Sequence, residues 1–103
     1  MSATMSSDQI FMCARFQAKP EKLEELRTRL LEMVTHTAQE EGCLFYNLHV
    51  DRSDPTIFYF LEGWKNQEAL AFHDSTQYVQ AIIRDSADLT TDGIKVNFMS
   101  KIS

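Results

Sequence analysis

Residues 18–37, AKPEKLEELRTRLLEMVTHT, carry the pattern that decides the fold. Pro20 suits the first turn of a helix, because its φ angle is already helical and its missing N–H leaves no bond unmade. Residues suited to a buried face then recur at steps of three and four among Glu, Lys and Arg: Leu23, Leu26, Leu30, Met33, Val34 and Thr37. This spacing predicts an amphipathic helix.

Segments typical of strands lie on both sides of this helix. Residues 9–18 form an apolar run before it, and residues 43–51 follow Gly42, which stands where a helix C-cap glycine is expected. A turn at residues 52–56 then leads into a further apolar run at residues 57–64. We therefore predict that the second and third strands form a hairpin.

Two short helices and a last strand complete the chain. Asn66 is suited to cap a helix that runs through His73, and Thr76 begins a second helix. A turn at residues 92–93 precedes residues 94–98, where apolar and polar side chains alternate as in a strand. The order β, α, β, β, α, β is that of the split βαβ, ferredoxin-like fold, an α+β class with an antiparallel sheet.

The strands also predict a second copy of the chain as partner. Helices in this fold cover one sheet face and leave the other bare. In the first strand Phe11 and Cys13 lie opposite Ile10, Met12, Ala14 and Phe16, and in the third Phe58, Phe60 and Trp64 lie opposite Ile57, Tyr59 and Leu61. Because both faces are apolar, we expect a homodimer whose sheets pack face to face.

Length and composition indicate one domain. The 103 residues are 44% hydrophobic, which suits a single core over residues 9–103, and the small polar residues 1–8 are predicted to be disordered, with neither a signal peptide nor an anchor. The net charge of -5 argues against nucleic acid as a partner. Since no stretch reaches membrane-spanning length, we expect a soluble, cytoplasmic protein with no membrane partner, in which Cys13 and Cys43 are free thiols.

Several segments, in this order and spacing, resemble the antibiotic biosynthesis monooxygenase (ABM) superfamily: AKPEKLEELRTRL, EEGCLFYNL, DP in the hairpin turn, and LEGWKNQEALAFHDST. The resemblance implies a dimeric α+β barrel with a small cavity between sheet and helices in each protomer. The superfamily includes cofactor-free oxygenases of polyketide phenols, quinol oxygenases, haem-degrading enzymes and an isomerase of a phosphorylated quorum-sensing signal. The segment FYFLEGWKNQEALAFHDST is most similar to that isomerase and to the quinol oxygenases.

Haem degradation is disfavoured by two departures from the pattern of the haem-degrading members. Those members need a histidine about ten residues beyond His73, where this chain has Ile83, and no histidine follows His73. They also use an asparagine in the first strand, where this sequence has Ala14 and Arg15. We therefore predict that the chain has no haem cofactor.

His73 is the first candidate for a catalytic residue. Leu70 and Ala69 precede it by three and four residues, which directs its imidazole to the inward face of a short helix. There it could accept a proton from a phenol or an enol. The W-x4-A-x3-H spacing of Trp64, Ala69 and His73 also resembles the family, although a lone histidine on an apolar face is often a satisfied core residue.

Two residues of the third predicted strand could support His73. Glu62 lies between Leu61 and Gly63, and an ionised carboxylate there would be costly without a partner. Glu62 could orient His73 or hold a substrate hydroxyl, or it could bond to backbone at the strand end. Trp64 could stack on a planar substrate or belong to the core.

Strand two is predicted to place Cys43, Phe45, Asn47 and His49 on one face and Tyr46 on the other. In a cavity Asn47 and His49 could donate hydrogen bonds to an oxyanion, whereas on the opposite face they would meet a dimer partner or solvent. Tyr46 is a further candidate for binding substrate. Alternation alone leaves open which face lines the cavity.

The functional prediction is a cofactor-independent monooxygenase of a small planar phenol, quinol or polyketide-like substrate, with dioxygen as the second substrate. No glycine-rich phosphate loop is present, and the three histidines show no metal-site spacing, so we predict no cofactor and no metal. Two alternatives stay open. One is an isomerase of a small phosphorylated signal, with Lys65 and Arg84 as single cations, and the other is a non-catalytic dimeric binding protein.

Overall fold

The computed structural model describes residues 8–103, so apart from Asp8 the predicted disorder of residues 1–8 lies outside it. The order of elements is the predicted one. Along the chain they are β1 (Ile10–Ala18), the short 3-10 helix η1 (Pro20–Lys22), α2 (Leu23–Thr37), β2 (Cys43–Val50), β3 (Ile57–Trp64), α3 (Gln67–Ser75), α4 (Gln77–Leu89) and β4 (Thr90–Met99). Asn66 and Thr76 cap α3 and α4 through their side-chain oxygens, as their sequence positions predict.

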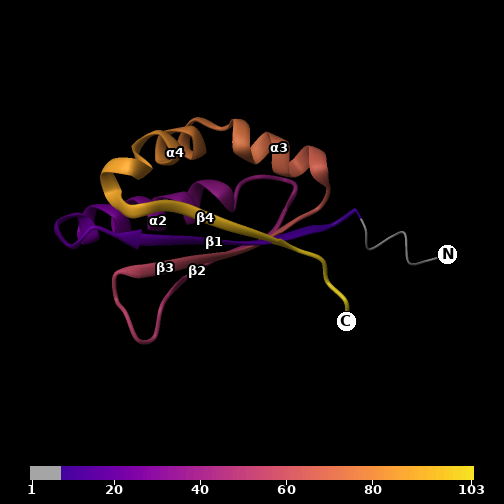
Figure 1. Cartoon of the computed structure of the whole chain (residues 1–103). Coiled ribbons are helices and arrows are strands. Elements are labelled where there is room, and N and C mark those ends of the chain that lie inside the picture. Colours follow the sequence, from indigo (N-terminus) through magenta and orange to yellow (C-terminus); the bar gives the residue numbers. More distant parts are fainter. Residues whose placement is uncertain (1–7) are drawn as a thin grey trace.

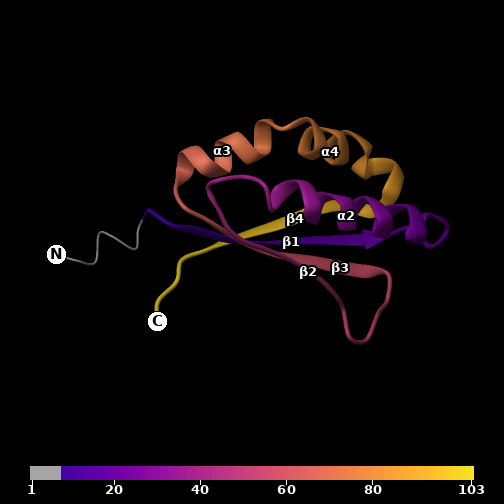
Figure 2. The same ribbon diagram turned by 180° about the vertical axis from the view of Figure 1, so that it is seen from behind.

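The described strands form one four-stranded sheet in the order β2-β3-β1-β4, with antiparallel neighbours throughout. All the helices lie on one side of this sheet (Figure 1), and the view from behind shows the same two layers (Figure 2). The ferredoxin-like α+β fold is thereby confirmed. Within the described residues no helix is long and apolar enough to span a membrane.

The core lies between the helices and the face of the sheet that they cover. The amphipathic pattern of α2 places Leu26 and Leu30 fully out of solvent. On the sheet, alternate residues of β1 and β3 meet them, so that Phe16, Phe60 and Trp64 are almost completely buried. Each such side chain stabilises the fold by about 1.5–3 kcal/mol relative to exposure.

The opposite face of the sheet, which we call the outer face, is covered by no helix of the described residues. It is formed by the alternate residues of the four strands, among them Phe11, Cys13, Phe45, Asn47, His49, Tyr59, Leu61, Gly63 and Met99. Phe45, Leu61 and Met99 are exposed there, and the Phe11 and Phe45 rings stack with centroids 6.0 Å apart. The outer face is therefore apolar at this end, as the strand pattern predicts, whereas Arg15, Lys95 and Asn97 make the rest of it more polar.

Three local predictions were wrong. Gly42 is no helix C-cap, because α2 ends at Thr37; its hydrogen atom is needed because a Cβ there would lie 2.3 Å from Cβ of Ala69 in α3. The register of β2 shifts after Cys43, which places Cys43 on the helix-covered face rather than beside Phe45. Strand β4 begins at Thr90 instead of residue 94, with Gly93 at φ +82 inside it.

Candidate active site

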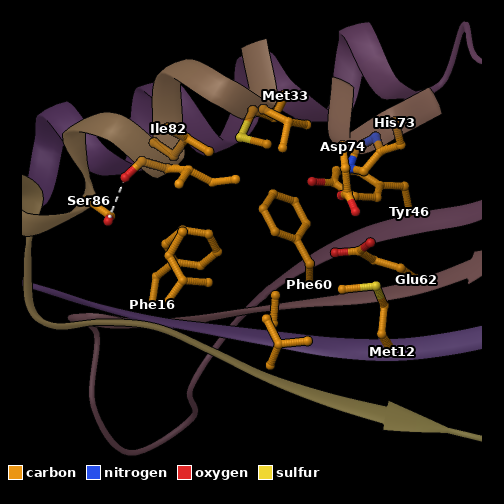
Figure 3. Close-up of a pocket in the computed structure, with 15 residues that line it drawn as sticks. Met12, Phe16, Met33, Tyr46, Phe60, Glu62, His73, Asp74, Ile82 and Ser86 are labelled. Carbon is orange, nitrogen blue, oxygen red and sulfur yellow. Dashed lines mark hydrogen bonds between the residues drawn. The ribbon is translucent and has the colours of Figure 1, made fainter. Parts of the chain in front are cut away.

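A cavity of about 340 Å³ lies between the sheet and the helices α3 and α4 (Figure 3). This volume falls in the range of small-molecule sites. Its walls are mostly apolar, from Met12, Ala14, Phe16, Met33, Phe60, Val79, Ile82, Ile83, Ile94 and Val96. The polar side chains that reach it are Tyr46, Glu62, His73, Asp74 and Ser86. The polar groups other than Ser86 gather at one end of the cavity, as Figure 3 shows.

His73 lies in the last turn of α3 and is 4% exposed. Its Nδ1 is 2.8 Å from Oε2 of Glu40, whose side chain is buried as well. Since a carboxylate can only accept, we assign the imidazole hydrogen to Nδ1, which donates to Glu40. Nε2 then keeps its lone pair, and a histidine oriented in this way is suited to act as a base.

Glu40 is a site residue that the sequence reasoning missed. It follows α2 in the turn before β2, and the hydroxyl of Tyr78 donates to the same Oε2 that His73 contacts. His36 stacks on the Tyr78 ring, with centroids 5.0 Å apart. The sequence did contain a signal for Glu40. An acidic residue just beyond the C-terminus of a helix interacts unfavourably with the helix dipole, which suggests that it has another role.

The same cluster contains polar atoms without partners. Among the described residues, the buried side-chain atoms that make no hydrogen bond are Oγ1 of Thr37 and Oε1 of Glu40. Leaving such atoms unpaired costs free energy, and native structures keep them few. Their occurrence together, next to His73, is consistent with a functional constraint on this part of the fold.

Glu62 projects from β3 into the cavity and is 4% exposed. Its Oε1 accepts a hydrogen bond from Nε1 of Trp64 at 3.0 Å, which is neither of the partners expected from sequence. Burial raises the pKa of Glu62 to about 7, and the charges of Asp74 and Glu40 raise it as well. Glu62 can therefore carry a proton near neutral pH.

The aromatic candidates pack around His73. Trp64 is fully buried, with its ring centroid 4.4 Å from that of His73, so it supports His73 and Glu62 from behind the cavity wall. Tyr46 lines the cavity, stacks on Phe60 at 4.3 Å and meets His73 edge to face at 5.5 Å. Burial raises the pKa of Tyr46 far above its ordinary value, so its hydroxyl stays protonated.

The structure separates the candidates on β2. Tyr46 pairs with Glu62 on the helix-covered face, whereas Asn47 and His49 are exposed on the outer face, opposite Leu61 and Tyr59. It thus brings together His73, Glu62, Trp64 and Tyr46, and it leaves Asn47 and His49 outside this cavity. Their part in binding or catalysis stays a prediction.

A ferredoxin-like sheet thus holds an apolar cavity under its helices, with a buried histidine–carboxylate pair at one end, in an α+β domain. Residues 9–85 match the family model described as antibiotic biosynthesis monooxygenase. That match spans most of the chain, and the chain therefore belongs to the antibiotic biosynthesis monooxygenase family.

Individual proteins are similar to this chain over most of its length. The chain is 31% identical over 87 residues to "Putative monooxygenase YcnE" of Bacillus subtilis (strain 168), covering 84% of this chain and 92% of that protein. It is 30% identical over 84 residues to "Uncharacterized protein sll1783" of Synechocystis sp., where 82% of this chain spans 57% of that protein. The solved structure of PA3566 from Pseudomonas aeruginosa is similar with a TM-score of 0.87 and 30% identity, covering 95% of this chain and 98% of that one.

Proposed function

We propose that this protein is a cofactor-independent monooxygenase that acts on a small planar phenol, quinol or polyketide-like ring. The observation that carries the proposal is the His73–Glu40 pair at the end of an apolar cavity. A base held in one tautomer and orientation, beside walls that exclude water, is what proton removal from a weakly acidic ring requires.

The first step is removal of a proton by Nε2 of His73. The imidazolium that forms is stabilised by Glu40, which already accepts the Nδ1 hydrogen. Glu62, when it carries its proton, can donate to the ring oxygen on which negative charge develops. The substrate is then an electron-rich anion in an apolar environment.

The second step is the reaction of that anion with dioxygen. For a ring CH₂ next to a conjugated carbonyl, dioxygen adds to the carbanion to form a C–O bond and, with a proton, a hydroperoxide. Loss of water breaks the O–O bond and leaves a carbonyl. One oxygen atom is thus in the product and the other in water, and the four electrons lost by the carbon reduce dioxygen. The protein supplies orientation and oxyanion stabilisation.

We propose in addition that two copies associate through their outer faces. Phe45, Leu61 and Met99 are 38%, 39% and 44% exposed there, which is unusual for neighbouring large apolar side chains on a face without helices. Sheet-on-sheet packing would remove them from water. The cavity lies on the other side of the sheet, so association leaves its helices uncovered.

Oxygen uptake by the purified full chain, treated with a chelator and offered a panel of quinols and hydroxyanthrones, tests the function. We expect protein-dependent uptake that falls by at least about a hundredfold in His73→Ala. Glu40→Gln keeps the shape of the side chain but weakens support of the imidazolium, so kcat falls by about tenfold with little change in KM.

Glu41→Gln is the matched control, because it makes the same change one residue away at an exposed position. Uptake that depends on the protein but is equal in His73→Ala would remove His73 from the mechanism. No uptake with any ring would overturn the oxygenase proposal and favour the isomerase, which would use the same base without dioxygen, or a binding protein without a reaction.

A further inference from the structure

The cavity has an uneven distribution of charge. Among the described residues that line it, the titratable side chains with formal charge to contribute are Glu62, His73 and Asp74, and there is no lysine or arginine. Any positive charge that His73 takes up is offset by Glu40, to which it is bonded. The polar end of the cavity therefore gains no net positive charge from His73, and it is negative wherever Asp74 and Glu62 are ionised, which for Glu62 means above about pH 7.

The two carboxyl groups are at different depths. Glu62 is buried on the sheet, whereas Asp74, which follows His73 in α3, is exposed on its outer side and reaches the same end of the cavity (Figure 3). The two groups influence one another, since the charge of Asp74 raises the pKa of Glu62. Asp74 is thus the carboxyl group nearer to solvent, and Glu62 is the deeper one.

The nearest candidates for a compensating cation are used elsewhere. Arg84 is exposed on α4 and donates to Asp85 at 3.1 Å, and Arg29 donates to the same carboxylate at 2.9 Å. Lys65 lines a separate pocket on the far side of Glu40. None of them belongs to the lining of the cavity that holds His73.

We infer that Glu62 and Asp74 make this cavity selective for uncharged hydroxylated rings, and that carboxylated and phosphorylated forms of the same rings are excluded. This inference rests on the proposed function, because it concerns the same site and reaction. It adds the chemical class of the substrate. A hydroxyl can donate to a carboxylate, whereas an anion loses its hydration and meets like charges in apolar surroundings. This selectivity against anions would also distinguish the proposed oxygenase from an isomerase of a phosphorylated molecule, which has to bind an anion.

Calorimetric titration of the full chain with 2-naphthol, 2-naphthoate and 2-naphthyl phosphate tests this, because the three probes share a ring and differ in charge. The titration is done at about pH 8.5, where Glu62, with its pKa of about 7, is ionised. We expect 2-naphthol to bind on the order of tenfold more tightly than 2-naphthoate and on the order of a hundredfold more tightly than the phosphate. Ile83→Trp, at the half-exposed cavity wall, should weaken 2-naphthol binding by about tenfold and so assigns the binding to this cavity.

Variants that replace a carboxyl group by an amide identify the residues responsible for the selectivity against anions. Glu62→Gln and Asp74→Asn should each narrow the preference for 2-naphthol over 2-naphthoate, by about tenfold for the buried group and about threefold for the exposed one, where solvent screens the charge. Glu68→Gln removes one charge from the same helix as Asp74 but outside the cavity, and it should leave the preference unchanged.

Each other outcome overturns the inference. Equal or tighter binding of 2-naphthyl phosphate would show that the cavity accepts anions, and failure of all three probes to bind would show that it does not take such rings. A preference that survives both neutral variants would remove Glu62 and Asp74 as its cause. Because binding is measured without turnover, 2-naphthol selectivity together with absent oxygen uptake would refute the proposed reaction and leave the selectivity standing.

Discussion

The two faces of the sheet differ more than their similar strand patterns suggest. On the helix-covered face a carboxylate, a histidine and a tyrosine are buried around a cavity. On the outer face Asn47 and His49 are exposed beside apolar Phe45 and Leu61. Tyr46, Asn47 and His49 are neighbouring candidates in the sequence. The structure distinguishes them by the face of the sheet to which each side chain points.

The largest expected effect is a loss of activity that distinguishes His73 on the helix-covered face from His49 on the outer face. His73→Ala should lower kcat on a ring substrate by about 10²- to 10⁴-fold, because the base is lost. It should also lower the melting temperature, because Glu40 is left buried without His73, so kcat is measured on protein that circular dichroism shows to be folded. If the outer face contributes nothing to the chemistry, His49→Ala keeps kcat within about twofold. Steady-state oxygen uptake checks both, and similar losses in the two variants would break the comparison.

The next prediction concerns association. Leu61→Glu puts a charge in the middle of the outer face, and its copy in a second protomer would meet it, so we expect the dimer to weaken by at least about a hundredfold. Phe72→Glu changes an exposed apolar residue on α3 and should leave association unchanged. Sedimentation equilibrium measures both. A wild-type chain that is monomeric at all concentrations would refute the proposed dimer.

The raised pKa of Glu62 predicts an unusual pH dependence of the free energy of unfolding. Its pKa rises from 4.5 in the unfolded chain to about 7 in the folded protein. The folded state therefore binds more protons between these values, so its free energy of unfolding falls as pH rises through this window and is level above it. The whole fall amounts to about 3 kcal/mol for this group.

Glu62→Gln should remove that fall. Urea denaturation at several pH values gives the free energy of unfolding of the wild type and of the variant. In the difference between the two, the contributions of the other carboxyl groups cancel. A difference that does not change between pH 4.5 and about 7 would show that Glu62 keeps an ordinary pKa. The outer face has no comparable buried carboxyl group among the described residues.

The smallest effect compares two glycines. Gly42→Ala should destabilise the fold by about 2–3 kcal/mol, because the new Cβ would lie 2.3 Å from Cβ of Ala69, which cannot rotate away. Gly63→Ala on the outer face should cost only about 1 kcal/mol, since it meets the ring of Phe45, which can move. Adding Ala69→Gly should rescue Gly42→Ala. Equal costs in urea denaturation would contradict this difference.

Much of the fold could be predicted because it depends on local patterns. The steps of three and four in α2, the caps Asn66 and Thr76, and the apolar run of β3 each follow from neighbouring residues, and their order selects the topology. Gly42 was misinterpreted for the same reason. Its neighbours suggest a helix cap, but the contact that requires a glycine is with Ala69, which is distant in sequence.

The site was only partly predictable. His73 and Glu62 are conspicuous as polar groups in apolar segments, so their burial could be expected. Glu40 has no such local context, and only the packing of α3 and α4 against the turn after α2 brings it to His73 and Tyr78. The partners of Glu62 could not be foreseen either, because the indole of Trp64 turns back along its own strand.

The sequence by itself determined the elements, their order and the presence of apolar residues on both sheet faces, because periodicity and capping are properties of short segments. Tertiary structure alone decided which face holds the cavity, which carboxylate contacts His73 and which of the described charged side chains line the cavity. Those features join residues that are tens of positions apart, and their energies depend on distances and burial that arise only when the helices close over the sheet.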